Sequence, residues 1–223
     1  MLTVPALMMV GVTVKEAVPM SLWVVSLVSL TAAMHQQVWK QLQYRLLIIL
    51  GTTGITGSAI GARIGASMSE SLQLAILAIL ILTVAVWTGF VRPENKVSTF
   101  RYIPALLAGF AIGLLTGMLG VGGGFLLVPA LIFLGIGHFP TAVGHSLIII
   151  IANAVGGIIS YSTVKSVHID IGLTVSIALI AAVGSIIGGI LLKRLPTARL
   201  QKGFAILLIV LGGFIAWRSL TAG

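Results

Sequence analysis

The sequence is poor in charged residues and contains no cysteine. Only 8% of its residues are Asp, Glu, Lys or Arg, whereas a soluble domain carries about 25%. A chain with so little charge has too little polar surface to cover a water-soluble core. The lack of cysteine excludes disulfides, thiol catalysis and cysteine-ligated metals.

Acidic residues are the scarcest of the charged ones. All four lie in or beside expected loops: Glu16, Glu70, Glu94 and Asp170. With no carboxylate inside an apolar stretch, we expect neither a carboxylate proton relay nor a buried cation site. The sequence also lacks metalloprotease, paired acid–base and nucleophile motifs. We therefore predict that the protein is not an enzyme and holds no metal or cofactor.

What fills the chain is hydrophobic sequence, with a mean hydropathy of +1.19. Most of its uncharged stretches approach or exceed the roughly 20 residues that span a bilayer as a helix. They are too long and continuous for the alternating strands of a membrane barrel. We predict an all-α, polytopic helical bundle in the lipid bilayer, with apolar stretches at 17–34, 46–62, 71–91, 102–120, 141–162, 171–192 and 203–217.

The net charge of +9 comes from 13 Lys and Arg residues in the short gaps between apolar stretches. Loop charges that set the orientation of membrane helices explain them better than a nucleic-acid surface does. Nucleic acid is therefore not a predicted partner, and a homo-oligomer is compatible with the sequence.

The two halves of the chain resemble each other. Four matches occur in order at a spacing of about 125 residues: 2–7 with 126–131, 17–22 with 142–147, Lys40 with Lys165, and 57–61 with 184–188. We predict an N-terminal repeat at 1–91, a linker loop at 92–101 and a C-terminal repeat at 102–220. Only the second half has a helix and a glycine cluster ahead of its matched region. The N-terminal repeat is thus expected to lack its first helix, as in a truncated chain.

The short stretch 125–135 decides how the halves are oriented. At 1.5 Å per residue it spans about 17 Å, less than the roughly 30 Å hydrocarbon core. If it only dips into the membrane, the halves are parallel and the positive residues divide seven to six. If it crosses together with its glycine-linked neighbour, the halves are inverted and the division is nine to four, which the positive-inside rule favours. We predict the inverted arrangement, with these nine on one side: Lys40, Arg45, Arg92, Lys96, Arg101, Lys193, Arg194, Arg199 and Lys202.

Several glycines are spaced four residues apart. Gly109, Gly113 and Gly117 share one helix face, and the same spacing occurs within 57–65 and 184–188. Small residues at this spacing let another helix approach closely. We predict packing faces at all three places.

Gly122, Gly123 and Gly124 differ because they are consecutive. Within a continuous helix each would cost about 1 kcal/mol. We predict an unwound break whose backbone N–H groups and following helix N-terminus bind an anion, as in the discontinuous helices of secondary transporters. A flexible hinge is the alternative.

Polar side chains in the uncharged helices complete the predicted site. His145 and Asn153 lie eight residues apart on one helix face, and Ser146 and Ser21 occupy equivalent positions in the two halves. Intramembrane polar groups normally face a cavity or a partner, although Ser and Asn can also join two helices. With two prolines that shape the short helices, the predicted substrate-binding residues are Gly122, Gly123, Gly124, Pro129, His145, Ser146, Asn153, Pro5 and Ser21.

A family resemblance is carried by the block GMLGVGGGFLLVPALIFLG, followed by AVGHSL and Asn153. This pattern resembles the TauE/SafE-type sulfite exporter family of bacterial membrane permeases. The resemblance implies a secondary transporter of small anions, namely sulfite, sulfonates or related sulfur-containing organic anions, in the bacterial inner membrane. The sequence departs from the family in having His145 where threonine is more usual and in lacking the first glycine break. The alternative function is a non-transporting membrane scaffold or assembly factor.

Overall fold

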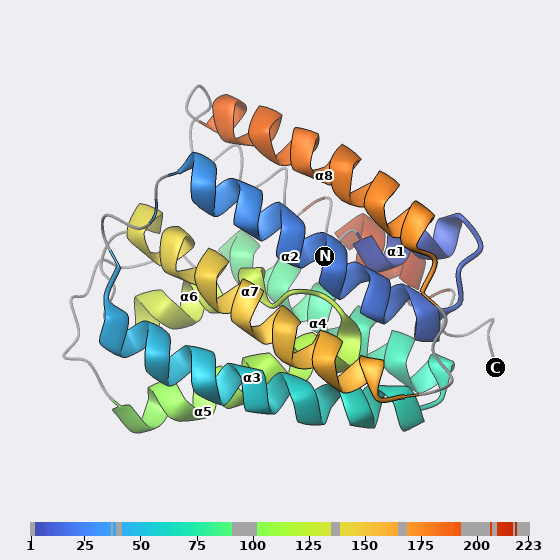
Figure 1. The fold of residues 1–223 in the computed structure, drawn as a ribbon, viewed down its shortest axis with the longest axis horizontal. Helices are drawn as coiled ribbons and strands as arrows, with labels where there is room; N and C mark the ends of the chain where they lie inside the picture. Colours follow the sequence, from blue (N-terminus) through green and yellow to red (C-terminus); the bar gives the residue numbers. More distant parts are fainter. Residues whose placement is uncertain are drawn as a thin grey trace.

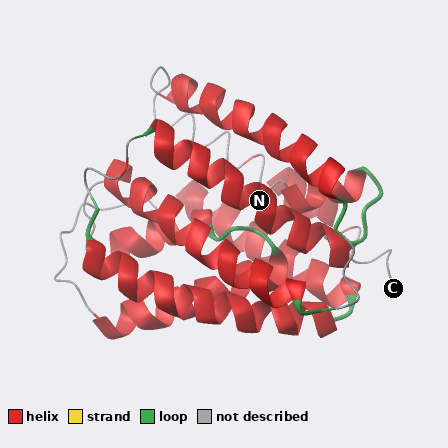
Figure 2. Cartoon of the chain, viewed as in Figure 1, coloured by secondary structure: helices red, strands yellow, loops and turns green. Residues whose placement is uncertain are grey.

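The computed structural model is helical wherever it has regular structure. It describes residues 3–36, 38, 42–90, 102–134, 139–164, 169–192, 206, 209–215 and 217. The predicted linker at 92–101 lies outside these residues, as do all Lys and Arg except Lys15, Arg45 and Arg63. The named helices are α1 (Thr3–Met9), α2 (Val14–His35), α3 (Tyr44–Ser67), α4 (Glu70–Phe90), α5 (Tyr102–Leu119), α6 (Gly124–Phe133), α7 (Phe139–Ser162) and α8 (Ile171–Leu192) (Figures 1 and 2).

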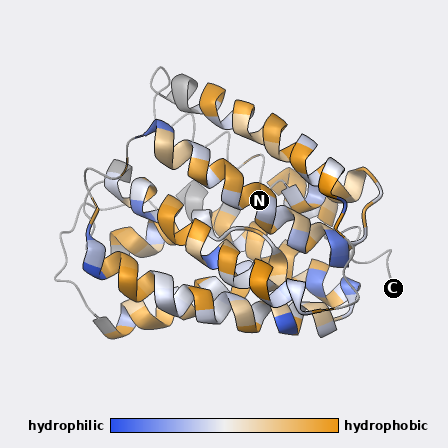
Figure 3. Cartoon of the chain, in the orientation of Figure 1, coloured by the Kyte–Doolittle hydropathy of each residue, from blue (hydrophilic) through white to orange (hydrophobic). Residues whose placement is uncertain are grey.

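The helices confirm the predicted membrane bundle. Four segments in the described part of the chain are long and apolar enough to cross a bilayer: Val14–His35, Tyr44–Ser67, Thr141–Ser162 and Ile171–Gly188. Shorter apolar helical segments run over Glu70–Val84 and Ile103–Leu119. Apolar side chains also face outward, most of all on α8 (Figure 3). An apolar exterior suits lipid rather than water.

The two long helices α2 and α7 run antiparallel. A Cβ placed on Gly157, near the end of α7, would lie 2.7 Å from Leu22 in the first half of α2. One placed on Gly144, near the start of α7, would lie 2.9 Å from Val38, just beyond the end of α2. Figure 1 shows the two helices side by side, with the end of α2 and the start of α7 at the same end of the bundle. These are the helices that the matched stretches 17–22 and 142–147 make equivalent, so their directions agree with inverted halves; the homology of the halves itself stays a prediction.

Helices α5 and α7 both run parallel to α3. Near the start of α3 the backbone N–H of Gln43 donates to His145, and farther along Ser160 donates to the carbonyl of Ala59 at 2.8 Å. Between α3 and α5, likewise, residues later in α3 contact residues later in α5. Because α5 and α7 are parallel, the chain must return across the bundle between them. The glycine break and α6 lie on that return path, as the inverted arrangement would need, and the arrangement itself stays a prediction.

The seam between α3 and α5 is built on glycine. A Cβ on Gly113 would overlap the carbonyl oxygen of Gly54, and one on Gly61 would overlap the carbonyl of Leu114. A Cβ on Gly65 would lie 2.7 Å from the carbonyl oxygen of Met118. The predicted packing faces on α3 and α5 are therefore confirmed, since only glycine lets the two backbones approach this closely.

The same prediction for α8 is wrong within the part of the chain that is described. A Cβ on Gly184 or Gly188 would meet no atom within 4 Å. The spacing of these glycines permits a close helix contact, but the described residues place no helix there.

Two clusters of buried apolar side chains form the core. One joins α1, α2 and α4 to the ends of α3, α5 and α7, and the other gathers residues of α3, α5, α6 and α7. The break lies between them, because Val121 belongs to the first cluster and Leu127 to the second. The irregular backbone of the break is thus enclosed by packed helices on both sides.

Candidate functional site

The predicted break between α5 and α6 is present and buried. Helix α5 ends at Leu119, and α6 begins at Gly124. Between them Gly120, Gly122 and Gly123 have φ angles of 67°, 70° and 62°. This left-handed conformation costs other residues about 1–2 kcal/mol, which explains why glycine occupies all three positions. All three are buried.

The break presents unpaired backbone donors. Among the residues described, four consecutive N–H groups find no acceptor: those of Val121, Gly122, Gly123 and Gly124. No side chain caps the N-terminus of α6 either. Each unpaired buried donor costs about 1–3 kcal/mol, and a helix N-terminus favours negative charge. The arrangement is suited to an anion that accepts these hydrogen bonds.

The break lies near the middle of the long helices, as the central green loop in Figure 2 shows. A Cβ on Gly124 would lie 2.7 Å from the Cδ1 atom of Ile150, which is halfway along α7. On the other side, Ser21 of α2 holds the start of the break through the carbonyl oxygen of Gly120 at 2.6 Å. Both halves of the chain therefore contribute to the site.

Asn153 is the predicted side chain whose surroundings most clearly suit a ligand. It is 0% exposed, and neither its Oδ1 nor its Nδ2 atom has a hydrogen-bond partner. Its amide lies directly against Gly54 of α3, where a Cβ would overlap Oδ1. Asn153 follows Ile150 by three residues and so shares its helix face. The amide is thus one turn from the residue that touches the N-terminus of α6.

The other predicted polar residues have partners within the protein. Ser146 donates to the carbonyl of Val143 in its own helix at 2.7 Å. For His145, Nδ1 lies 2.7 Å from the carbonyl oxygen of Thr141, and Nε2 accepts from the N–H of Gln43 at 2.8 Å. The ring is therefore the tautomer protonated at Nδ1, and it caps the start of α3.

The two prolines lie within the short helices and bring no polar group to the break. Pro129 is inside α6 and has no N–H to donate to the carbonyl of Phe125, four residues earlier. Pro5 is in the first turn of α1, where proline is tolerated. Helix α1 packs against α2.

Three polar residues around the break were not predicted from sequence. Thr116 of α5 faces Gly123, where a Cβ would lie 2.5 Å from its Oγ1 atom. Gln73 of α4 donates to the carbonyl of Met118, and its Oε1 atom is unpaired. Ser58 of α3 is 0% exposed, and its hydroxyl is also unpaired. The only signal in the sequence was that each is a polar residue inside an apolar stretch.

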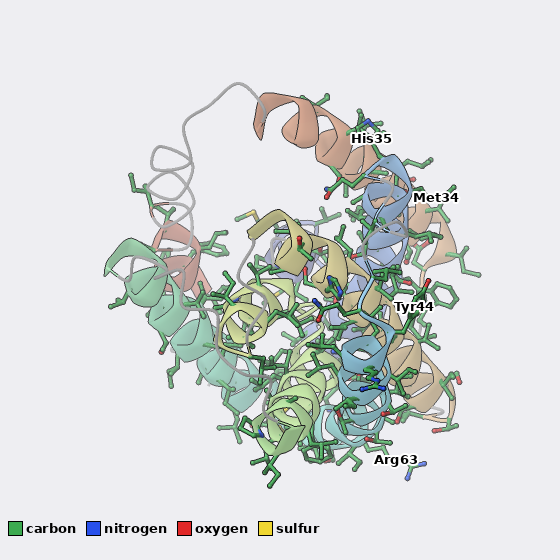
Figure 4. The ribbon with its side chains drawn as sticks, turned by 90° about the vertical axis from the view of Figure 1, so that its left-hand side faces the viewer. Met34, His35, Tyr44 and Arg63 are labelled. Atoms are coloured by element: carbon green, nitrogen blue, oxygen red, sulfur yellow. The ribbon has the colours of Figure 1, made fainter. Side chains whose placement is uncertain are left out.

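No charged side chain contributes to this region within the described residues. The buried polar residues there are Ser, Thr, Gln, Asn and one His. Figure 4 shows Arg63 pointing away from the bundle. No group of three potential metal ligands occurs among the residues searched. Backbone dipoles and neutral donors therefore determine the electrostatics of the break.

Comparisons with known proteins agree with these features. A family model described as sulfite exporter TauE/SafE matches residues 1–215. A probable membrane transporter protein of Xylella fastidiosa strain Temecula1 is 30% identical over 200 residues, covering 81% of this chain and 72% of that protein. The probable membrane transporter protein YunE of Bacillus subtilis is 26% identical over 221 residues, covering 90% and 80%. No solved structure matches the chain.

Proposed function

Since the chain belongs to the sulfite exporter TauE/SafE family, we propose that it is a secondary transporter of small anions. Its substrates are sulfite, sulfonates or related sulfur-containing organic anions, and it resides in the inner membrane of a bacterial cell. The description of the family and relatives described as probable membrane transporters support this proposal. Membership of a transporter family is also consistent with a protein that is not an enzyme.

One observation carries the choice of an anion. Four consecutive N–H groups at the break, those of the buried Val121, Gly122 and Gly123 and of the half-buried Gly124, have no acceptor in the described part of the chain, and α6 begins there without a cap. A ligand with several acceptor oxygens satisfies such a set without a basic side chain. Gly122, Gly123 and Gly124 supply donors in this proposal, Asn153 adds its amide, and Ser21 holds the break in place.

The arrangement also suits alternating access. Secondary transporters with inverted repeats bind substrate near the midplane, at broken helices where the repeats meet. Here Gly124 lies beside the middle of α7, and Ser21 reaches the break from α2. His145, Ser146, Pro129 and Pro5 then frame the site rather than contact the anion.

A thermal-shift screen of the purified protein tests the proposal. The anions are sulfite, sulfate, thiosulfate, sulfoacetate and taurine, compared with chloride at matched ionic strength. A ligand at 100 times its Kd stabilises the folded protein by about 2.7 kcal/mol. We expect at least one sulfur anion to raise the melting temperature and to be taken up by proteoliposomes. A scaffold would show neither effect, and that result would overturn the proposal.

The Gly184→Ala variant is a matched control for this screen. It adds one methyl group to a helical glycine that has no neighbour within 4 Å. Its response to each anion should equal that of the parent protein. A different response would show that the shift does not come from the break.

A further inference from the structure

Within the described residues, Asn153 and Ser58 are two buried side chains that have no hydrogen-bond partner at all. Both are 0% exposed, and three polar atoms are unpaired: Asn153 Oδ1, Asn153 Nδ2 and Ser58 Oγ. Hydroxyls inside apolar helices commonly bond back to their own helix, as Thr116 does to Ile112 at 2.8 Å. Ser58 does not. Asn153 and Ser58 therefore have both donor and acceptor atoms that still need a hydrogen-bond partner.

Asn153 of α7 and Ser58 of α3 lie at adjacent turns where these two helices meet. A Cβ on Gly157, four residues after Asn153, would lie 3.0 Å from Ser58 Oγ. Gly54, one turn before Ser58 on α3, contacts the Asn153 amide. The unpaired atoms thus occupy adjacent turns of the contact between α3 and α7, and Ser58 is the one farther from Ile150.

A ligand that only accepts hydrogen bonds leaves Asn153 Oδ1 without a donor, because the Ser58 hydroxyl does not bond to it in the structure. A fully deprotonated oxyanion would pair with the break and with Asn153 Nδ2. It would leave Oδ1, a buried acceptor, facing oxygen lone pairs. Leaving a buried acceptor unpaired costs about as much as losing the bond. The ligand must therefore also carry a donor.

The geometry of α7 gives the position of the ligand's donor group, and the surrounding residues indicate its charge. Gly124 is beside Ile150, and Asn153 is three residues later, about 4.5 Å along the axis of α7. This offset is comparable to a two-carbon chain. Among the described residues no buried carboxylate is present to pair with an ammonium group. A neutral hydroxyl is therefore favoured over a charged amine.

We infer that the preferred substrate is a hydroxyl-bearing organic sulfonate, with the hydroxyl about two carbons from the sulfur. The sulfonate oxygens accept from the N–H groups of the break, and the hydroxyl donates to Asn153 Oδ1 while Ser58 completes its solvation. This inference rests on the proposed function, because it requires the anionic head to bind at the break.

The test compares three sulfonates by calorimetric titration of the detergent-purified protein. They are 2-hydroxyethanesulfonate, ethanesulfonate, which lacks the hydroxyl, and propane-1-sulfonate, which has a methyl group in its place. We expect the hydroxyl compound to bind about tenfold more tightly than the other two, the contribution of one well-formed hydrogen bond. Equal binding of all three would overturn the inference and leave the anion site standing. Binding of none would overturn the inference, and the thermal-shift screen with sulfite and the other anions would then decide the proposed function separately.

Two variants locate the effect. Asn153→Leu keeps a branched side chain of similar size but removes both polar atoms, so the tenfold preference should disappear. Without ligand, this variant should melt at a higher temperature than the parent. Gly54→Ala keeps the Asn153 side chain but displaces its amide, because the three atoms nearest to the new Cβ all belong to Asn153. It should abolish the same preference even if Asn153→Leu folds poorly. A preference that persists in either folded variant would place the hydroxyl elsewhere and overturn the inference.

Discussion

The hydroxyl of Ser21 on α2 lies 2.6 Å from the carbonyl oxygen of Gly120, where α5 ends and the break begins. The same hydroxyl lies 2.6 Å from the carbonyl of Val18 and can donate to only one oxygen at a time. The contact joins residues 99 positions apart. It fixes the break against the first half of the chain.

Removing this hydroxyl should loosen the break. In Ser21→Ala the buried carbonyl of Gly120 loses its partner, which costs about 1–3 kcal/mol of folding stability. We expect a lower melting temperature and weaker anion binding. Ser162→Ala is the control, because Ser162 is exposed and bonds only within its own helix, so the change should be within about 0.5 kcal/mol. Equal effects of the two variants would contradict the anchoring role of Ser21.

Two glycine-to-alanine variants should distinguish a glycine that is packed against another helix from one that is not. Gly113→Ala forces a methyl group into the backbone of Gly54, and overpacking of this kind costs about 1–3 kcal/mol or more. Gly184→Ala meets nothing within 4 Å and should stabilise α8 by up to about 1 kcal/mol. Melting temperatures should therefore move in opposite directions. A parallel shift would mean that the α3–α5 seam is not as tight as described.

His145 should matter for folding rather than for binding. Its Nε2 atom accepts from the N–H of Gln43 at the start of α3. His145→Ala leaves that donor unpaired, and we expect a loss of about 1–3 kcal/mol, with the Kd for the anion unchanged. Titration and thermal melting of the same sample measure both quantities. If affinity falls while the melting temperature holds, His145 belongs to the substrate site as the sequence predicted.

The absence of cysteine makes the orientation directly testable. Gln36 ends α2 and Ser162 ends α7, and these helices are antiparallel. A single cysteine at Gln36 should label with an impermeant thiol reagent from the cytoplasm, and one at Ser162 from outside. Labelling of both from the same side would rule out the inverted arrangement.

The sequence predicted features that depend on local patterns. Apolar length identified the helices, and three consecutive glycines identified the break, because the left-handed φ angles at Gly122 and Gly123 exclude side chains. It could not show which helix faces meet. Ser58 belongs to a glycine-rich stretch, and only the meeting of α3 with α7 gives it a role beside Asn153. His145 was predicted as a site residue because it is polar and lies in an uncharged stretch, and its structural partner Gln43 is 102 positions away in the chain.

The glycine spacing also shows that a sequence pattern cannot identify which helix faces meet. Gly57 and Gly61 on α3 resemble Gly184 and Gly188 on α8, yet only the α3 pair touches a neighbouring backbone in the described structure. A small-residue pattern states that close approach is sterically possible. Whether a helix fills that space depends on the order and direction of all the others.

The glycine seam has a mechanical consequence. Along α3 and α5, backbone meets backbone at successive turns, from Gly113 against Gly54 to Gly65 against Met118. Sliding one helix along the other would bring backbone atoms into overlap at every turn. The α3–α5 pair therefore resists shear and moves as one rigid unit. Rocking of the α3–α5 pair as a rigid body is compatible with this contact, whereas a small sliding shift between the two helices is not. Any gating displacement must then be absorbed at the softer joints around it, where side chains rather than backbones meet.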